Sequence, residues 1–219
     1  MKISILNTSM EHPINAWLEK WMEKNLINHD IDLLRSKTEL IGGDILFLIS
    51  CSELISKFDR DKFKKTLVIH ASDLPKGRGW SPHVWEIING AQEISLTLLE
   101  AEDKVDSGDI WKKIKVKVPK TALFEEINHI IFDAEIELMD FALDSFHSIH
   151  PEKQSKDIEP SYWPKRTPKD SEIDIKKSIE EQFDVIRVCD VNRFPAFFCI
   201  EGKKFTIKIE EVNEEDNYN

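Results

Sequence analysis

The stretch that decides the fold of this chain is His70-Ala71-Ser72-Asp73-Leu74-Pro75-Lys76-Gly77-Arg78-Gly79. It follows the apolar run Thr66–Ile69, which predicts a buried strand, and its proline and glycines predict a loop. Farther along, Asp106 lies on a second loop between the strand-like runs Ile94–Leu99 and Ile110–Val118. A histidine and a carboxylate on loops at strand ends are the raw material of an acid–base site.

Outward from this stretch, strand-like and helical patterns alternate through the first 150 residues. The predicted strands before it are Ile3–Leu6, Ile31–Leu34 and Asp44–Ile49, and the predicted helices begin near Pro13, Pro82 and Thr121. The expected fold class is therefore α/β, with a mostly parallel twisted sheet flanked by helices. Ligands of such sheets bind beyond the carboxyl ends of the strands, which is where His70 lies.

The last third of the chain has a different pattern. Residues 150–165 are polar and proline-rich, which indicates a linker. A helix over Ser171–Glu181 and short strands over Val185–Val188, Ala196–Ile200 and Phe205–Ile209 are predicted after it. We therefore expect a main domain over residues 1–150, and a linker with a small β-rich C-terminal appendage over residues 151–219.

Composition narrows the class of partner. The chain has 219 residues and a formal net charge of −11, which argues against nucleic acid or an acidic membrane as the partner. Its three cysteines (Cys51, Cys189 and Cys199) have no metal-like spacing and indicate reduced thiols in the cytoplasm. The run Met1–Leu6 is too short for a signal peptide, and no segment approaches the ~20 apolar residues of a membrane span.

Several common sites are absent from the sequence. There is no Gly-x-Gly-x-x-Gly after the first strand, no Walker loop and no Gly-x-Ser-x-Gly, so a dinucleotide site and a hydrolase nucleophile are not expected. No His/Cys cluster indicates a metal. Among seven histidines, His70 alone follows a buried strand and precedes a loop of turn formers, which selects it as the candidate for chemistry.

The motifs resemble the formyltransferases that use 10-formyltetrahydrofolate. Members of that family carry His-x-Ser-x-Leu-Pro-x-x-x-Gly, then Asn-Gly, then Asp-x-Gly-x-Ile. The corresponding residues here are His70–Gly79, Asn89-Gly90 and Asp106–Ile110, in the same order and spacing. The resemblance is good over residues 44–148 and weak over the first 40.

The appendage resembles the segment that follows the catalytic domain in sugar N-formyltransferases. The residues that carry this resemblance lie within Tyr162–Asp170, Ile173-Asp174, Ile186-Arg187 and Pro195–Phe198, with Gly202–Lys204. The loop Gly77–His83 is most similar to enzymes of pseudaminic-acid-type sugar biosynthesis, and to the formylation domain of some nonribosomal peptide synthetases. One departure concerns Val68, where the family usually has an Asn that helps to hold the formyl oxygen; losing such a donor costs ~3 kcal/mol.

The resemblance implies transfer of a formyl group from 10-formyltetrahydrofolate to a primary amine, with no metal. His70 would stabilise the tetrahedral intermediate and move the proton, and Asp106 would orient the imidazole. The residues expected at the folate are Ser50, Cys51, Ser52, Glu53, Leu54, Leu99, Val105 and Asp106. The residues expected at the acceptor are Asn7, Lys76, Gly77, Arg78, Trp80 and His83, with the guanidinium fork of Arg78 suited to a pyrophosphate.

The expected function is therefore a sugar N-formyltransferase that acts on a nucleotide-linked amino sugar for a surface glycan, as a cytoplasmic homodimer. Two alternatives stay open. One is formylation of an aminoacyl or peptidyl amine, of the methionyl-tRNA or nonribosomal peptide type. The other, prompted by Val68, is a folate- or nucleotide-binding protein without turnover.

Overall fold

The computed structural model describes residues 1–212. A six-stranded sheet forms its centre, in the order β2-β1-β3-β4-β6-β7. Neighbouring strands are parallel from β2 to β4, and β6 and β7 are antiparallel to their neighbours. The strands of this sheet are β1 (Lys2–Leu6), β2 (Asp30–Leu34), β3 (Gly43–Leu48), β4 (Phe63–His70), β6 (Glu93–Glu100) and β7 (Ile110–Lys117). The predicted α/β class with a mostly parallel sheet is confirmed.

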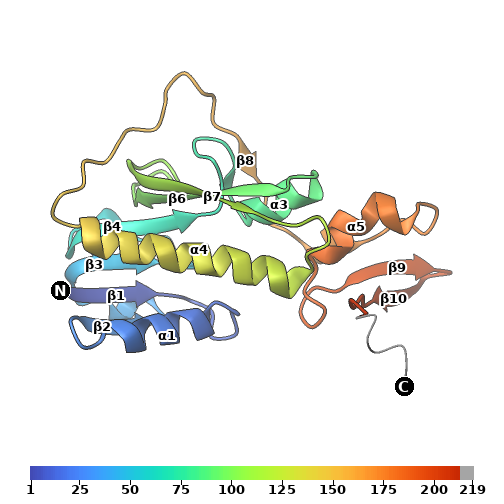
Figure 1. Ribbon diagram of the computed structural model, residues 1–219, viewed down its shortest axis with the longest axis horizontal. Helices are drawn as coiled ribbons and strands as arrows, with labels where there is room; N and C mark the ends of the chain where they lie inside the picture. Colours follow the sequence, from blue (N-terminus) through green and yellow to red (C-terminus); the bar gives the residue numbers. More distant parts are fainter. Residues whose placement is uncertain (213–219) are drawn as a thin grey trace.

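Two helices cover one face of the sheet, α1 (Asn15–Asn25) and α4 (Phe124–Ser145) (Figure 1). Apolar residues on alternate positions of the strands, such as Ile5 and Phe47, form the main core beneath these helices. The indole N–H of Trp21 on α1 donates to Asp140 Oδ1 on α4, at 2.7 Å, which joins the two helices. The long helix predicted from Thr121 to Phe146 is confirmed to within a few residues.

The opposite face of the sheet carries a smaller core. Leu6, Leu46 and Phe63 pack there with Leu40 and Ile55, beside the short elements η1 (Lys37–Glu39) and α2 (Lys57–Arg60). The parallel strands run toward the end of the molecule where α3 (Pro82–Ile88) and the appendage lie (Figure 1). His70, the last residue of β4, is therefore at the carboxyl edge of the sheet.

The chain from Phe146 to Ser161 contains no helix, arches over the molecule and returns to the His70 loop (Figure 1). Two short pairings anchor it: Ile110 with Glu152, and β5 (Arg78–Gly79) with β8 (Tyr162–Trp163). This part of the predicted linker is therefore fixed to the main domain at both ends.

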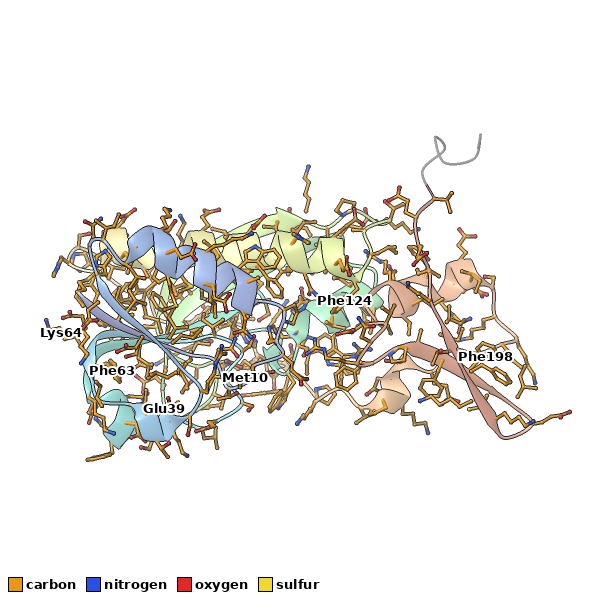
Figure 2. All side chains as sticks on the ribbon, turned by 90° about the horizontal axis from the view of Figure 1, so that it is seen from below. Met10, Glu39, Phe63, Lys64, Phe124 and Phe198 are labelled. Carbon is orange, nitrogen blue, oxygen red and sulfur yellow. The ribbon has the colours of Figure 1, made fainter. Side chains whose placement is uncertain are left out.

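The appendage contains η2 (Pro168–Ser171), α5 (Ile179–Arg187) and the antiparallel hairpin of β9 (Ala196–Ile200) and β10 (Lys203–Ile207). Figure 2 shows Phe198 of this hairpin at the end of the molecule opposite to Phe63 and Lys64. The strands predicted over Ala196–Ile200 and Phe205–Ile209 are confirmed as this hairpin, with the second shifted to Lys203–Ile207. The division into domains at residue 150 stays a prediction.

Two predictions for the appendage are wrong. Val185–Val188 is not a strand, because its first three residues end helix α5, which begins only at Ile179 rather than at Ser171. The Ser178 hydroxyl accepts from the Glu181 N–H, and the Glu181 carboxylate accepts from the Ser178 N–H. This capping box fixes the start of the helix, and helical spacing then buries Gln182 and Ile186 on one face.

No helix among residues 1–212 is both long and apolar enough to cross a membrane. The cytoplasmic location stays a prediction.

Candidate active site

His70 ends β4 and turns its side chain into an enclosed environment. The side chain is only 8% exposed, and Asp106 approaches it from a separate loop. His70 Nδ1 lies 3.6 Å from Asp106 Oδ1, and His70 Nε2 lies 2.8 Å from the carbonyl oxygen of Gly77. The structure therefore brings together the two side chains that the sequence motifs single out.

Asp106 reaches His70 because its loop folds back over β4. The loop starts beside the middle of that strand, where the Ala101 N–H donates to the Thr66 carbonyl at 2.8 Å. At Asp106 the backbone takes a left-handed conformation, with φ of +54°, which Asp tolerates better than most residues. Asp106 Oδ2 then accepts the Gly79 N–H at 2.9 Å, which leaves Oδ1 facing the imidazole.

This arrangement suits proton transfer. A neutral imidazole carries a single N–H, so it can donate to only one of the two oxygens that flank the His70 ring. The separation of 3.6 Å between His70 and Asp106 is too long for a hydrogen bond. Catalytic pairs are often this loose before the ligand binds and tighten in the complex. The pair can thus hold and release a proton at His70 with little movement.

The 150–165 segment supplies part of this site, which was not foreseen from the sequence. Gln154 Nε2 donates to the carbonyl oxygens of Asp106 and Gly108, at 2.9 and 3.0 Å. The Ser161 hydroxyl accepts the Gly77 N–H at 2.9 Å. These contacts fix the left-handed turn of one loop and the carbonyl that meets His70 on the other. A single glutamine or serine in a polar segment carries no pattern that would reveal such a role.

We predict that Gln154→Ala lowers kcat about tenfold while KM for the formyl donor stays nearly unchanged, because a positioning contact is lost rather than a binding one. Gln154→Glu should also lose activity, because a carboxylate cannot donate to the two carbonyls. Steady-state kinetics with both substrates measure this. Gln92→Ala, at an exposed glutamine of the same chain, is the control. Equal kcat in all three variants would rule out the positioning role.

The residues predicted at the folate lie on two loops near the pair. Ser50 to Leu54 follow β3, the neighbour of β4, and Val105 precedes Asp106. Leu54 and Val105 are 75% and 50% exposed, so both loops offer apolar side chains at the surface. Leu99 is fully buried and pairs with Val68, which leaves only its backbone for a ligand.

The polar members of the loop after β3 are engaged with neighbouring loops. Ser50 Oγ lies 3.2 Å from His12 Nε2, and the Ser52 N–H donates to Thr8 Oγ1 at 3.0 Å. The Glu53 carboxylate accepts the Lys37 N–H, and the Cys51 thiol donates to the Glu53 carbonyl at 3.5 Å. Hydrogen bonds within this loop and to neighbouring loops therefore hold its conformation.

The residues predicted at the acceptor divide into exposed and enclosed groups. Lys76 is exposed, and Trp80 is 43% exposed with Lys165 Nζ 4.8 Å above its ring. Asn7 is fully buried, and its Nδ2 has no partner within the described part of the chain. Gly77 is enclosed because a Cβ there would lie 2.9 Å from Ser72 Cβ and 3.2 Å from Trp163 Nε1.

Arg78 is 5% exposed, and its guanidinium is already used. It donates to Gln154 Oε1 at 2.6 Å and to the Tyr162 hydroxyl at 3.3 Å. Arg78 therefore holds Gln154, which in turn holds the backbone at Asp106. Whether it also meets an acceptor stays a prediction.

His83 and Glu86 on α3 add two half-buried titratable groups that do not belong to the pair. Burial, together with the nearby charge of His70, lowers the pKa of His83 to about 4, so its ring is neutral near pH 7. Burial, followed by the charge of Asp73, raises the pKa of Glu86 to about 7. Glu86 Oε1 is 3.4 Å from the Cβ position of Gly77, a proximity that the sequence patterns did not indicate.

Glu86 predicts a pH dependence of stability. Its pKa rises from 4.5 to about 7 on folding, so the folded state binds more protons than the unfolded state in that window. Its contribution to stability is therefore largest at low pH and is lost as the pH rises toward and beyond 7. Glu86→Gln should raise the melting temperature by a few degrees more at about pH 8 than at about pH 4.5. Glu23→Gln, at an exposed carboxylate, should show no such trend, and an equal shift at both pH values would refute the assignment.

Val68 lies two positions before His70 on the same face of β4, between Leu48 and Leu99. It is half-buried and has no polar group to offer. Ser72 Oγ and His83 Nδ1 are enclosed without a hydrogen-bond partner among the described residues. Of the enclosed polar atoms without a partner in the described residues, those nearest in sequence to His70 are Ser72 Oγ, Thr66 Oγ1 and Arg78 Nε. Within residues 1–212, no group of three or more His, Cys, Asp or Glu side chains is placed to hold a metal ion.

Comparison with known proteins shows the family of this chain. The formyl transferase family model matches residues 9–143, which is more than half of the chain. This chain belongs to the formyl transferase family.

Among curated members of that family, it is similar to methionyl-tRNA formyltransferase from Finegoldia magna, with 26% identity over 90% of this chain and 62% of the relative. The chain spans less than two thirds of the length of these curated relatives, from 43% to 62%.

Solved structures with the same fold include formyl transferases of different stated activities. Methionyl-tRNA formyltransferase from Clostridium thermocellum aligns with a TM-score of 0.82 at 24% identity, over 97% of this chain and 94% of that one. A sugar N-formyltransferase from a Shewanella species aligns with 0.72 at 14% identity, over 97% and 99%. HypX from Aquifex aeolicus, in complex with tetrahydrofolic acid, aligns with 0.77 at 22% identity, over 93% and 36%. At these identities the likeness shows a shared fold.

Proposed function

We propose that this protein is an N-formyltransferase that moves a formyl group from 10-formyltetrahydrofolate to the primary amine of a nucleotide-linked amino sugar, for surface glycan biosynthesis. The observation that supports the chemistry is the enclosed pair of His70, at the end of β4, and Asp106, on a separate loop, 3.6 Å apart, with Asp106 held by the Gly79 N–H. Its occurrence in a member of the formyl transferase family favours formyl transfer over other acid–base reactions.

The residues present fit a donor that carries a reduced pterin and an aromatic ring. Leu54 and Val105 expose apolar surface on the loops after β3 and before Asp106, and half-buried Val68 lies beside His70. Backbone groups of the same loops can read the polar edge of a pterin. The complex of HypX with tetrahydrofolic acid supports the donor class, because that protein shares the fold.

The proposed roles follow from the geometry. When bound, the donor supplies a formyl carbon that a neutral amine can attack, which forms a C–N bond and leaves an oxyanion. His70 takes the proton that the amine nitrogen loses, and returns it to the folate nitrogen as the second C–N bond breaks. Asp106 holds the imidazole and favours its protonated form during this transfer. No covalent bond to the protein is required.

The net charge of the chain favours a small acceptor over a nucleic acid. A formal charge of −11 makes transfer RNA an unfavourable partner, because phosphate neutralisation needs a broad cationic surface. An amino sugar carried on a nucleotide presents only a diphosphate, which a small basic site can bind. The curated relatives favour the alternative acceptor, methionyl-tRNA, by their names. A folate-binding protein without turnover is the third candidate, and Val68 is the feature that favours it.

A homodimer in the cytoplasm is part of the proposal. The hairpin of β9 and β10 exposes Ile200 and Phe205, by 46% and 45%, which is consistent with a covered surface in an assembly. The measured mass in solution tests this part.

The function is tested with the purified protein, 10-formyltetrahydrofolate and a panel of acceptors. We expect mass spectrometry to find a formamide on a nucleotide-linked 4-amino sugar, together with release of tetrahydrofolate. A higher kcat/KM with methionyl-tRNA or with a carrier-bound amino acid would show that this compound, rather than the nucleotide-linked sugar, is the acceptor. Folate binding without product from any amine would contradict the proposed activity and support the third candidate.

A further inference from the structure

A basic pocket opens beside the Asp106 loop, between that loop and the returning 150–165 segment. It has a volume of about 410 Å³. We call it the basic pocket, and its lining residues are Arg78, Lys104, Ser107, Asp109, Lys153, Gln154, Ser155, Lys156, Ile158 and Pro160. Ser107 follows Asp106 directly, and Arg78 lies between Gly77 and Gly79, which contact His70 and Asp106. The pocket therefore shares its walls with the supports of the candidate active site.

The charge of the basic pocket contrasts with that of the chain. Four of its lining residues are basic and only Asp109 is acidic, although the whole chain carries −11. None of the four basic side chains takes part in an ion pair with another residue of the part of the chain that the structure describes. Like charges gathered without counter-charges repel one another, so an anion would lower the free energy of this arrangement.

Arg78 makes the basic pocket a built site rather than a chance group of surface lysines. Arg78 is only 5% exposed, and its Nε–H has no partner among the described residues. Its two terminal nitrogens hold Gln154 and the Tyr162 hydroxyl, so the guanidinium is fixed in place. Lys104 Nζ lies 5.9 Å from the centre of the Tyr162 ring. The hydrogen bonds from Arg78 and Lys104 lower the pKa of Tyr162, as expected beside positive charge.

We propose that the basic pocket binds a phosphate-type anion, namely the diphosphate group of a nucleotide. The unpartnered Nε–H of Arg78 and the ammonium groups of the lysines suit phosphate oxygens, and the Ser155 hydroxyl can donate to the same anion. One source of this group is the diphosphate of the acceptor itself. This part of the inference deepens the proposed function and rests on it. The second source is a separate nucleotide that acts through Gln154 on the Asp106 loop.

The site is tested by titrating the full chain with inorganic pyrophosphate and with uridine diphosphate in a calorimeter. The variant Lys104→Ala/Lys153→Ala/Lys156→Ala removes three charges that contact no carboxylate in the described residues. We expect it to weaken pyrophosphate binding by about tenfold or more. The control Lys20→Ala/Lys120→Ala/Lys177→Ala removes the same charge from exposed positions elsewhere and should bind as the wild type does.

Equal affinity of the pocket variant and the wild type would overturn the proposal, and so would the absence of binding to the wild type at millimolar pyrophosphate. Kinetics separate the two sources. A raised KM for the acceptor with an unchanged kcat identifies the acceptor's own diphosphate, whereas bound uridine diphosphate that does not compete with the acceptor identifies a separate nucleotide. Because the titration needs no turnover, it distinguishes failure of the pocket from failure of the proposed activity.

Discussion

Replacing His70 or Asp106 by alanine should reduce kcat/KM for formyl transfer by about a thousandfold or more, with the fold intact. His70 is the proposed proton carrier, and Asp106 holds its ring from 3.6 Å away. Removing His70 leaves the amine without a group to take its proton, and removing Asp106 leaves the imidazole without the carboxylate that orients it. The double variant should lose little more than either single variant, because the two side chains act as a unit.

Release of tetrahydrofolate and formation of the formamide measure this effect, and circular dichroism checks the fold. His147→Ala and Asp144→Ala change the same residue types at exposed positions away from the Asp106 loop and serve as controls. Near-full activity in either site variant would show that the pair is not the acid–base group. Equal loss in the site variants and the controls would point to damaged folding instead.

A second large effect is expected at Gly108, two residues beyond Asp106. A Cβ at this position would lie 1.9 Å from the carbonyl oxygen of Glu100 and 2.8 Å from its carbonyl carbon. The opposing atoms are backbone, and the Glu100 N–H is itself bonded to the Asp109 carbonyl at 2.9 Å. Relief of the clash therefore has to move the whole turn that carries Asp106.

We expect Gly108→Ala to lower the free energy of unfolding by about 3 kcal/mol and to reduce kcat by at least about a hundredfold. Denaturant unfolding and steady-state kinetics measure the two effects. Gly90→Ala is the matched control: its φ of +89° strains an alanine, but nothing lies within 4 Å of the added Cβ. It should cost only about 1 kcal/mol and leave kcat unchanged. Wild-type kcat in Gly108→Ala would show that the turn does not position Asp106.

The appendage shows where local patterns misled the prediction. Three of the four residues in Val185–Val188 are apolar and β-branched, which favours a strand in isolation. The sequence also contained Ser178 and Glu181 at capping-box spacing, and this signal places the start of a helix that runs through Arg187. At this place the capping box at Ser178 is a stronger signal than the strand propensity of Val185–Val188.

The two strands that precede His70 in the chain were predictable for a physical reason. A strand covered on both faces must be apolar throughout, so Asp44–Ile49 and Thr66–Ile69 stand out in the sequence, and a loop of turn formers after the second marks the carboxyl edge. The residue types at His70 and Asp106 likewise carry their chemistry in any context. These features are local, and the chain order alone is enough to find them.

Other features depend on contacts between distant parts of the chain. Gln154 supports the turn at Asp106, Ser161 fixes the Gly77 carbonyl, and Lys153 and Lys156 join Arg78 and Lys104 around one pocket. Each lies in a polar segment with no periodicity, so its role exists only after the segment returns over the sheet. The sequence by itself determined which side chains do the proposed chemistry. The tertiary structure decided how they are held and where the charges gather, because hydrogen bonds and electrostatic fields depend on distance in space rather than on separation along the chain.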